Sequence, residues 1–124
     1  METDVCVVIK RLIHGDWFTA KISGILLIPV AFAFVGSGMQ GELMNYYKKC
    51  IHDEVPQVRR TVGSTLKDMI ALIPKVPESE VINIFNQISK DDQDSVRLMS
   101  VENAIALTKV IPYAVKIELY YKIL

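Results

Sequence analysis

Two histidines and two cysteines are the residues of this chain best suited to hold a metal or to act as nucleophiles. His14 and His52 lie 38 positions apart, and Cys6 and Cys50 fall at apolar positions of helical patterns. Neither histidine has a carboxylate or cysteine at ligand spacing, and the sequence contains no Gly-rich phosphate loop or nucleophile-elbow serine. We therefore expect exposed histidines, two buried reduced thiols, no metal or cofactor, and no active site.

A set of charged residues repeats with the same spacing. Asp53 precedes Arg59 by six positions, and Asp91 precedes Arg97 by six. If the two segments lie side by side, the carboxylate of one turn can accept hydrogen bonds from the guanidinium of the adjacent unit. Such bidentate pairs fix the geometry of neighbouring repeats. We expect these four residues to form a structural ladder, with Lys21 as a weaker rung.

Aromatic and charged residues near the same turns do not fit a purely structural role. Trp17 and Phe18 lie where a helical hairpin has little core to bury them, and aromatic and Arg residues are frequent anchors of protein interfaces. Arg60 stands where the other repeats have Ile22 and Leu98. The alternative is a solvated loop edge on which Trp17 packs against the neighbouring turn. The predicted partner-binding edge comprises Trp17, Phe18, Glu54, Val55, Pro56, Arg60, Asp92, Gln93 and Asp94.

The spacing of these residues reflects a repeat of 38 residues along the chain. Residues 13–21, 51–59 and 89–97 align, and in each segment polar turn residues give way to an apolar and then a basic residue. A repeat of this length is typical of a solenoid, in which each unit buries its apolar face against a neighbour. The helical spacing of apolar residues predicts a first helix at Asp4–Ile13 and, after each turn, second helices at Thr19–Val35, Pro56–Ile73 and Ser95–Ile111.

The predicted fold is an all-α superhelix, because no segment alternates with a period of two. About three helical hairpins and a stump divide the chain into residues 1–38, 39–76, 77–112 and a partial unit 113–124. The last predicted helix, Tyr113–Leu124, is too apolar for the polar outer face of a terminal repeat. We therefore expect a piece of a longer array whose terminal helices promote self-association.

Composition and charge narrow the class of partner. Lys+Arg and Asp+Glu balance at 14 each, so there is no basic field for nucleic acid, and a protein is the expected partner. The apolar run Ile25–Val35 is shorter than the roughly 20 residues that a membrane-spanning helix needs. Pro29 interrupts this run and should kink its helix. A membrane-associated helical protein is the alternative. The acidic start lacks the basic region of a signal peptide, which favours a cytoplasmic or nuclear location.

Three turn motifs in register resemble a known family. Asp16-Trp17-Phe18-Thr19, then Asp53-x-x-Pro56-x-Val58-Arg59-Arg60, then Asp91-x-Gln93-Asp94-Ser95-Val96-Arg97-Leu98, closely resemble the HEAT-repeat scaffold (A, 65-kDa regulatory) subunit of protein phosphatase 2A. The resemblance covers nearly the whole chain. It implies a position around the fourth to sixth repeats, in the N-terminal half of the family's array. The loop around Pro74–Ser79 is one residue shorter than the family's usual spacing.

The resemblance also implies which residues contact partners. In this family the hairpin turns bind the regulatory (B-type) subunits, whereas the catalytic subunit docks on C-terminal repeats that should be absent here. Trp17 and Phe18 keep the family residues of one turn, Pro56 and Arg60 keep those of the next, and Gln93 and Asp94 match in the third, whereas Glu54 replaces an Asp. We expect a non-catalytic phosphatase scaffold. The alternative is a HEAT or armadillo adaptor of another pathway, such as a transport receptor.

Overall fold

A computed structural model describes residues 2–73 and 75–110 of the chain. Within these ranges every regular element is a helix, and the predicted all-α fold is confirmed. The predicted last helix Tyr113–Leu124 lies outside the described residues. The described helices are α1 (Glu2–Ile13), α2 (Phe18–Phe32), α3 (Ser37–Cys50), α4 (Pro56–Ile70), α5 (Glu78–Ser89), α6 (Asp94–Arg97) and α7 (Met99–Thr108).

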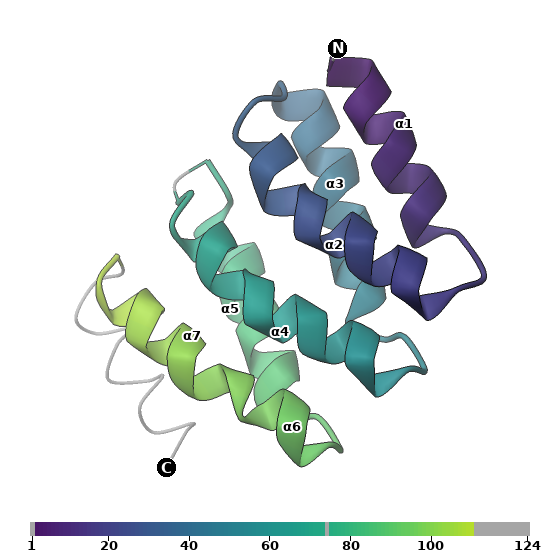
Figure 1. Cartoon of the computed structure of the whole chain (residues 1–124). Coiled ribbons are helices and arrows are strands. Elements are labelled where there is room, and N and C mark those ends of the chain that lie inside the picture. The colour runs from purple at the N-terminus through teal and green to yellow at the C-terminus, as the bar shows by residue number, and fades with distance from the viewer. Residues whose placement is uncertain (1, 74, 111–124) are drawn as a thin grey trace.

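The helices form antiparallel hairpins that stack side by side as an α-α superhelix (Figure 1). The first helices of the hairpins, α1, α3 and α5, lie in one layer. The second helices, α2, α4 and the α6–α7 pair, lie in the other. All three turns within the hairpins lie along one edge of the stack, and the connections between hairpins lie along the opposite edge. Residues of equal phase in the 38-residue repeat therefore occur side by side.

The core lies between the two layers and is built from one apolar face of each helix. The apolar residues recur at helical spacing along each helix, so they lie on one face. Removing this face from water is the main driving force for stacking. Two buried polar side chains join neighbouring helices. The Tyr47 hydroxyl of α3 lies 2.8 Å from both the Val62 carbonyl and the Thr65 hydroxyl of α4. The Asn103 amide of α7 donates to the Gly63 carbonyl of α4 at 2.8 Å.

Several helix boundaries differ from those that the sequence predicts. Pro56 is the first residue of α4, where its missing N–H removes no hydrogen bond. Ser37 begins α3, so the expected repeat boundary between residues 38 and 39 lies inside this helix. α2 and α4 each end three residues before the predicted end, at Phe32 and Ile70, because the last residues form turns.

The third hairpin departs most from prediction, because its second helix is divided into α6 and α7 at Leu98. The Ser100 hydroxyl donates to the Arg97 carbonyl at 2.6 Å, and the Val101 amide donates to Leu98 instead. A serine that bonds a nearby carbonyl in this way competes with the regular helical ladder. Helix α6 also begins one residue earlier than predicted, with Gln93 as its N-cap.

The apolar run around Pro29 belongs to the packed solenoid. Ile25, Ile28 and Phe32 are buried, and α2 continues for three residues beyond the buried Pro29. The kink expected at this proline stays a prediction. Across residues 2–73 and 75–110, none of the helices has the length and apolar character that crossing a bilayer requires.

The contact between α4 and α7 predicts a strong effect of enlarging Gly63. An added Cβ would lie 2.8 Å from the Met99 Cβ, which cannot move without shifting the α7 backbone. We expect Gly63→Ala to lower the free energy of unfolding by about 1–3 kcal/mol. Gly41→Ala is the control, because nothing lies within 4 Å of its added Cβ and the helix should gain roughly 0.5–1 kcal/mol. Urea unfolding measures both changes, and equal effects at the two sites would contradict the close packing.

Candidate protein-binding ridge

In each of the three hairpins, the first helix leads into a turn that carries a carboxylate. In the second turn, an Asp53 carboxylate oxygen accepts the Val55 amide at 2.9 Å. In the third, an Asp91 oxygen accepts the Gln93 amide at 3.0 Å. Aspartate favours such turns because its short side chain can bond the backbone two residues later. The same side chains are thereby held at the edge of the stack. The first turn has Gly15 at this position.

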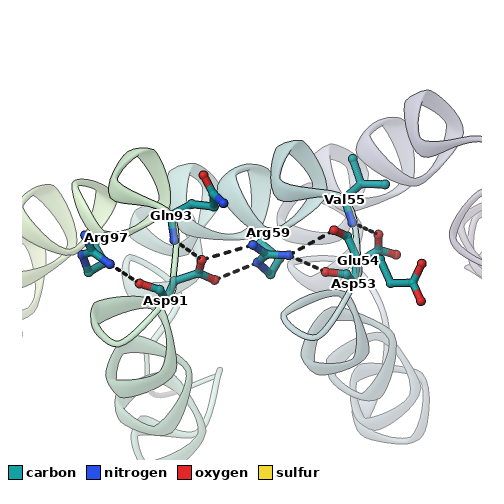
Figure 2. Close-up of polar contacts among 7 residues, drawn as sticks. All are labelled: Asp53, Glu54, Val55, Arg59, Asp91, Gln93 and Arg97. Carbon is teal, nitrogen blue, oxygen red and sulfur yellow. Dashed lines mark hydrogen bonds and ion pairs between the residues drawn. The ribbon is translucent and has the colours of Figure 1, made fainter.

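Each of these aspartates also contacts a basic residue of the preceding hairpin. The Lys21 ammonium lies 2.7 Å from Asp53, with 25% and 12% of the two side chains exposed. The Arg59 guanidinium donates two hydrogen bonds to the Asp91 carboxylate, from Nε to Oδ2 at 2.8 Å and from Nη2 to Oδ1 at 3.2 Å. The bidentate geometry fixes the orientation as well as the distance of the two turns. We call Lys21, Asp53, Arg59, Asp91 and Arg97 the ladder (Figure 2 shows the last four).

The arginines also bind their own turns, which the residue spacing alone does not reveal. Arg59 Nη1 donates to the Asp53 carbonyl at 2.7 Å and to the Glu54 carbonyl at 3.3 Å. Arg97 binds the Asp91 carbonyl in the same way, and its other nitrogen contacts the Asp94 carboxylate. The Arg59 guanidinium, at the start of a second helix, thus joins its own turn to the turn of the next hairpin (Figure 2). The repeated six-residue spacing was the only sequence signal of these carbonyl contacts.

The ladder changes the acidity of its members. Burial alone would raise the pKa of the Asp53 carboxyl, but hydrogen bonds from Lys21 and the Val55 amide outweigh it and lower the pKa below the ordinary 3.8. Burial is likewise outweighed at Asp91, where bonds from Arg59 and the Gln93 amide lower the pKa. The hydrogen bond to Asp53 raises the pKa of Lys21. All three groups therefore carry their charges at neutral pH.

The lowered pKa values predict a loss of stability in acid. A carboxylate whose pKa is lower in the folded chain stabilises the fold above its unfolded value of 3.8, and this contribution disappears as the pH falls through the folded value. We expect Asp91→Asn to destabilise the chain at neutral pH by about 1–2 kcal/mol, and by progressively less below the ordinary pKa. Urea unfolding of both proteins from neutral pH to about pH 3 measures the difference. A destabilisation by Asp91→Asn that increases as the pH falls would contradict the lowered pKa of Asp91.

The residues predicted to contact a partner lie beside the ladder. Trp17 is 76% exposed and Phe18 41%, so Trp17 is not packed against the neighbouring turn as the alternative required. Arg60 is exposed on the first turn of α4, one residue beyond the ladder arginine. Val55 and Pro56 are half-buried, whereas Glu54, Asp92, Gln93 and Asp94 are exposed. We call Trp17, Phe18, Glu54, Val55, Pro56, Arg60, Gln93 and Asp94 the turn ridge.

The histidines and cysteines have separate environments. His14 is exposed, with its Nδ1 2.9 Å from the Lys10 carbonyl and its ring edge-on to Tyr46 at 5.4 Å. Both cysteines are buried in the core as thiols, and burial raises the pKa of Cys50 to about 11, so this thiol stays protonated at neutral pH. Over the described part of the chain, no three His, Cys, Asp or Glu side chains are grouped as a metal site.

Comparison with known proteins gives a consistent set of relatives. A protein of Caenorhabditis elegans named as a probable serine/threonine-protein phosphatase PP2A regulatory subunit is 31% identical over 117 residues, which is 94% of this chain and 20% of that protein. The A-type regulatory subunit of protein phosphatase PP2A from Schizosaccharomyces pombe is 32% identical over 83% of this chain and 18% of its own length. This chain is homologous to a segment of the A-type regulatory subunits of PP2A.

A further relative is also named a PP2A regulatory subunit, and it too is matched over only part of its length. The PP2A 65 kDa regulatory subunit of Drosophila melanogaster is 34% identical over 66% of the chain and 13% of its own length. The chain therefore spans about a fifth or less of the length of the curated relatives it matches. A search against models of protein families found no match.

Proposed function

We propose that this chain is a non-catalytic scaffold segment of the protein phosphatase 2A type, which binds a regulatory (B-type) subunit through the turn ridge. The relatives are named regulatory subunits, which supports a scaffold over an enzyme. The catalytic subunit would bind repeats that lie outside this segment. The segment would therefore hold the regulatory subunit in a fixed place along a longer solenoid.

The observation that carries the proposal is the fixed alignment of the turns beside exposed anchor residues. The ladder pairs Lys21 with Asp53 and Arg59 with Asp91, so the three turns are joined in one row. Trp17 and Arg60 are exposed beside that row. Aromatic and arginine side chains supply most of the binding energy in many protein interfaces. A rigid display of such residues reduces the entropy that binding must overcome.

The charges of the ridge also favour a polar protein partner. Arg60 offers a planar guanidinium, whereas Glu54, Gln93 and Asp94 offer acceptors. Trp17 and Phe18 add apolar contact area at the first turn. The formal net charge of the chain is zero. Binding should therefore depend on local complementarity rather than on a long-range field, and we expect only modest sensitivity to salt.

Titration calorimetry with purified subunits tests the proposal. The chain should bind a regulatory B-type subunit, whereas the isolated catalytic subunit should not bind. The same chain with Asp53→Lys, which places a like charge against Lys21 and Arg59, should lose affinity for the regulatory subunit, because the turns no longer align. Binding only to the catalytic subunit, or no binding to any class of regulatory subunit, would contradict the proposed function.

A further inference from the structure

The three hairpins differ at the basic residue of the ladder. Arg59 and Arg97 hold this position in the second and third hairpins, whereas the first hairpin has Lys21. An arginine presents several N–H donors in a planar fork, but a lysine presents one ammonium group at the end of a flexible stem. A lysine therefore cannot reproduce all the contacts that an arginine makes at this position.

Arg59 shows which acceptors a guanidinium binds there (Figure 2). Its Nη1 donates to the carbonyls of Asp53 and Glu54 in its own turn, while Nε and Nη2 donate to the Asp91 carboxylate of the next turn. Arg97 likewise donates to a carbonyl of its own turn. A guanidinium at this position thus binds two backbone carbonyls of one turn and the carboxylate of the turn that follows.

The first turn offers the same acceptors to a different donor. The repeat makes Gly15, Asp16 and Asp53 the equivalents of the three residues that Arg59 binds. The Lys21 ammonium bonds Asp53 Oδ2 at 2.7 Å and bonds no other residue in the part of the chain that the structure describes. The carbonyls of Gly15 and Asp16 accept no hydrogen bond from a described residue. Two carbonyl acceptors of the kind that Arg59 binds are therefore available in the first turn.

A pocket lies where these acceptors meet. It has a volume of about 270 Å³ between the first and second turns, and its lining includes Gly15, Asp16, Lys21 and Asp53. The lining thus contains the equivalents of the residues that Arg59 binds and the equivalent of Arg59 itself. The pocket therefore corresponds to the region into which the longer, forked side chain extends in the second hairpin.

The charges around the pocket favour recognition by hydrogen-bond geometry. Lys21 and Asp53 neutralise each other, and the other charged residues of the lining, Lys49 and Asp16, are exposed and of opposite sign. His14 also lines the pocket, but its Nδ1 contacts a carbonyl of α1. Backbone carbonyls only accept hydrogen bonds, so they favour a ligand with several donors over an anion. A planar guanidinium meets this requirement better than an ammonium does.

We propose that the pocket between the first and second turns binds the guanidinium of an arginine side chain of the protein that occupies the turn ridge. One edge of the guanidinium faces the carbonyls of Gly15 and Asp16. Another edge faces the Asp53 carboxylate, which has acceptor positions beyond those used by Lys21 and the Val55 amide. The proposal rests on the proposed function for the source of the arginine, but the pocket itself can be tested without any phosphatase subunit.

NMR titration of the chain with N-acetyl-arginine methylamide tests the pocket. The backbone amide signals of Gly15, Asp16 and Asp53 should shift and saturate. Lys21→Arg should abolish these shifts, because the guanidinium of the chain itself then fills the pocket. The same change should raise the urea concentration at the midpoint of unfolding, so loss of binding would not reflect loss of the fold. Lys67→Arg is the matched control, since Lys67 is 51% exposed on α4 and does not line the pocket.

Three further ligands and outcomes decide the chemistry. The equivalent citrulline compound has a neutral urea group in place of the guanidinium, and it should bind at least about tenfold more weakly. Equal shifts in the unmodified chain and in Lys21→Arg, or no saturable shift at all, would overturn the proposal. Binding of N-acetyl-glutamate methylamide in place of the arginine compound would also overturn it, because the pocket would then select an anion through Lys49.

Calorimetry with a purified regulatory B-type subunit tests the source of the arginine. Lys21→Arg should weaken binding of that subunit by about tenfold, whereas Lys67→Arg should leave it unchanged. Unchanged binding by Lys21→Arg would show that this subunit places no arginine in the pocket, and would overturn that part of the proposal. Failure of the unmodified chain to bind any regulatory subunit would contradict the proposed function instead, and the titration with the arginine compound would still decide the pocket.

Discussion

Replacing Arg59 with alanine should lower the free energy of unfolding by about 3 kcal/mol. The side chains of Arg59 and Asp91 are only 15% and 9% exposed, so the ion pair is largely shielded from water. Its removal leaves the Asp91 carboxylate without its bidentate partner and the Asp53 carbonyl without its 2.7 Å donor. An uncompensated, partly buried charge costs more than a lost surface contact.

Neighbouring substitutions separate this effect from a general loss of charge. Arg60→Ala changes the same residue type one position later, but at an exposed site outside the ladder, and should alter stability by less than about 0.5 kcal/mol. Arg59→Lys should recover only part of the loss, because an ammonium cannot reproduce the forked contact. Urea unfolding measures all three variants. An equal effect of Arg59→Ala and Arg60→Ala would contradict the structural role of the ladder.

Trp17→Ala should weaken capture of a regulatory B-type subunit by about 2 kcal/mol, or roughly 30-fold in the dissociation constant. This expectation rests on the proposed function. The side chain is 76% exposed at the first turn, so its truncation removes contact area for a partner but little packing within the chain. The melting temperature and helicity should therefore remain close to those of the unmodified chain.

Phe34→Ala provides the matched control for Trp17. Phe34 is 80% exposed, but it lies just beyond the opposite end of α2, away from the turn ridge. Its truncation should leave the affinity for the regulatory subunit unchanged. Calorimetry with the purified regulatory protein compares the two variants. Equal losses from both would show that exposed aromatic area, rather than the turn ridge, determines binding, and unchanged affinity in both would remove Trp17 from the interface.

The general architecture was accessible from the sequence because solenoid packing is local and periodic. Apolar residues at helical spacing identified both layers, and the 38-residue repeat identified which helices are equivalent. Repeats that contact only their neighbours need no long-range topology to be inferred. The homologous relatives agree with the family that the three turn motifs resemble.

The structural features that the sequence did not predict depend on individual hydrogen bonds. Periodicity carries no information about the division of the third hairpin's second helix at Leu98, beside which the Ser100 hydroxyl bonds the Arg97 carbonyl. The carbonyl contacts of Arg59 likewise require the backbone path of the turn. The exposed Trp17, by contrast, agrees with the expectation that a hairpin turn has little core to bury it. The assignment of the turn ridge to a partner came from the resemblance and stays a proposal.

A double-mutant cycle between Arg59 and Asp91 tests most directly that the hairpins stack with their turns in one row. These residues are 32 positions apart and meet only if adjacent repeats lie side by side in register. The free energies of unfolding of Arg59→Ala, Asp91→Ala and the double variant should give a coupling energy above about 1 kcal/mol. Strictly additive effects would mean that the two side chains do not meet, and would contradict the stacked arrangement of the turns.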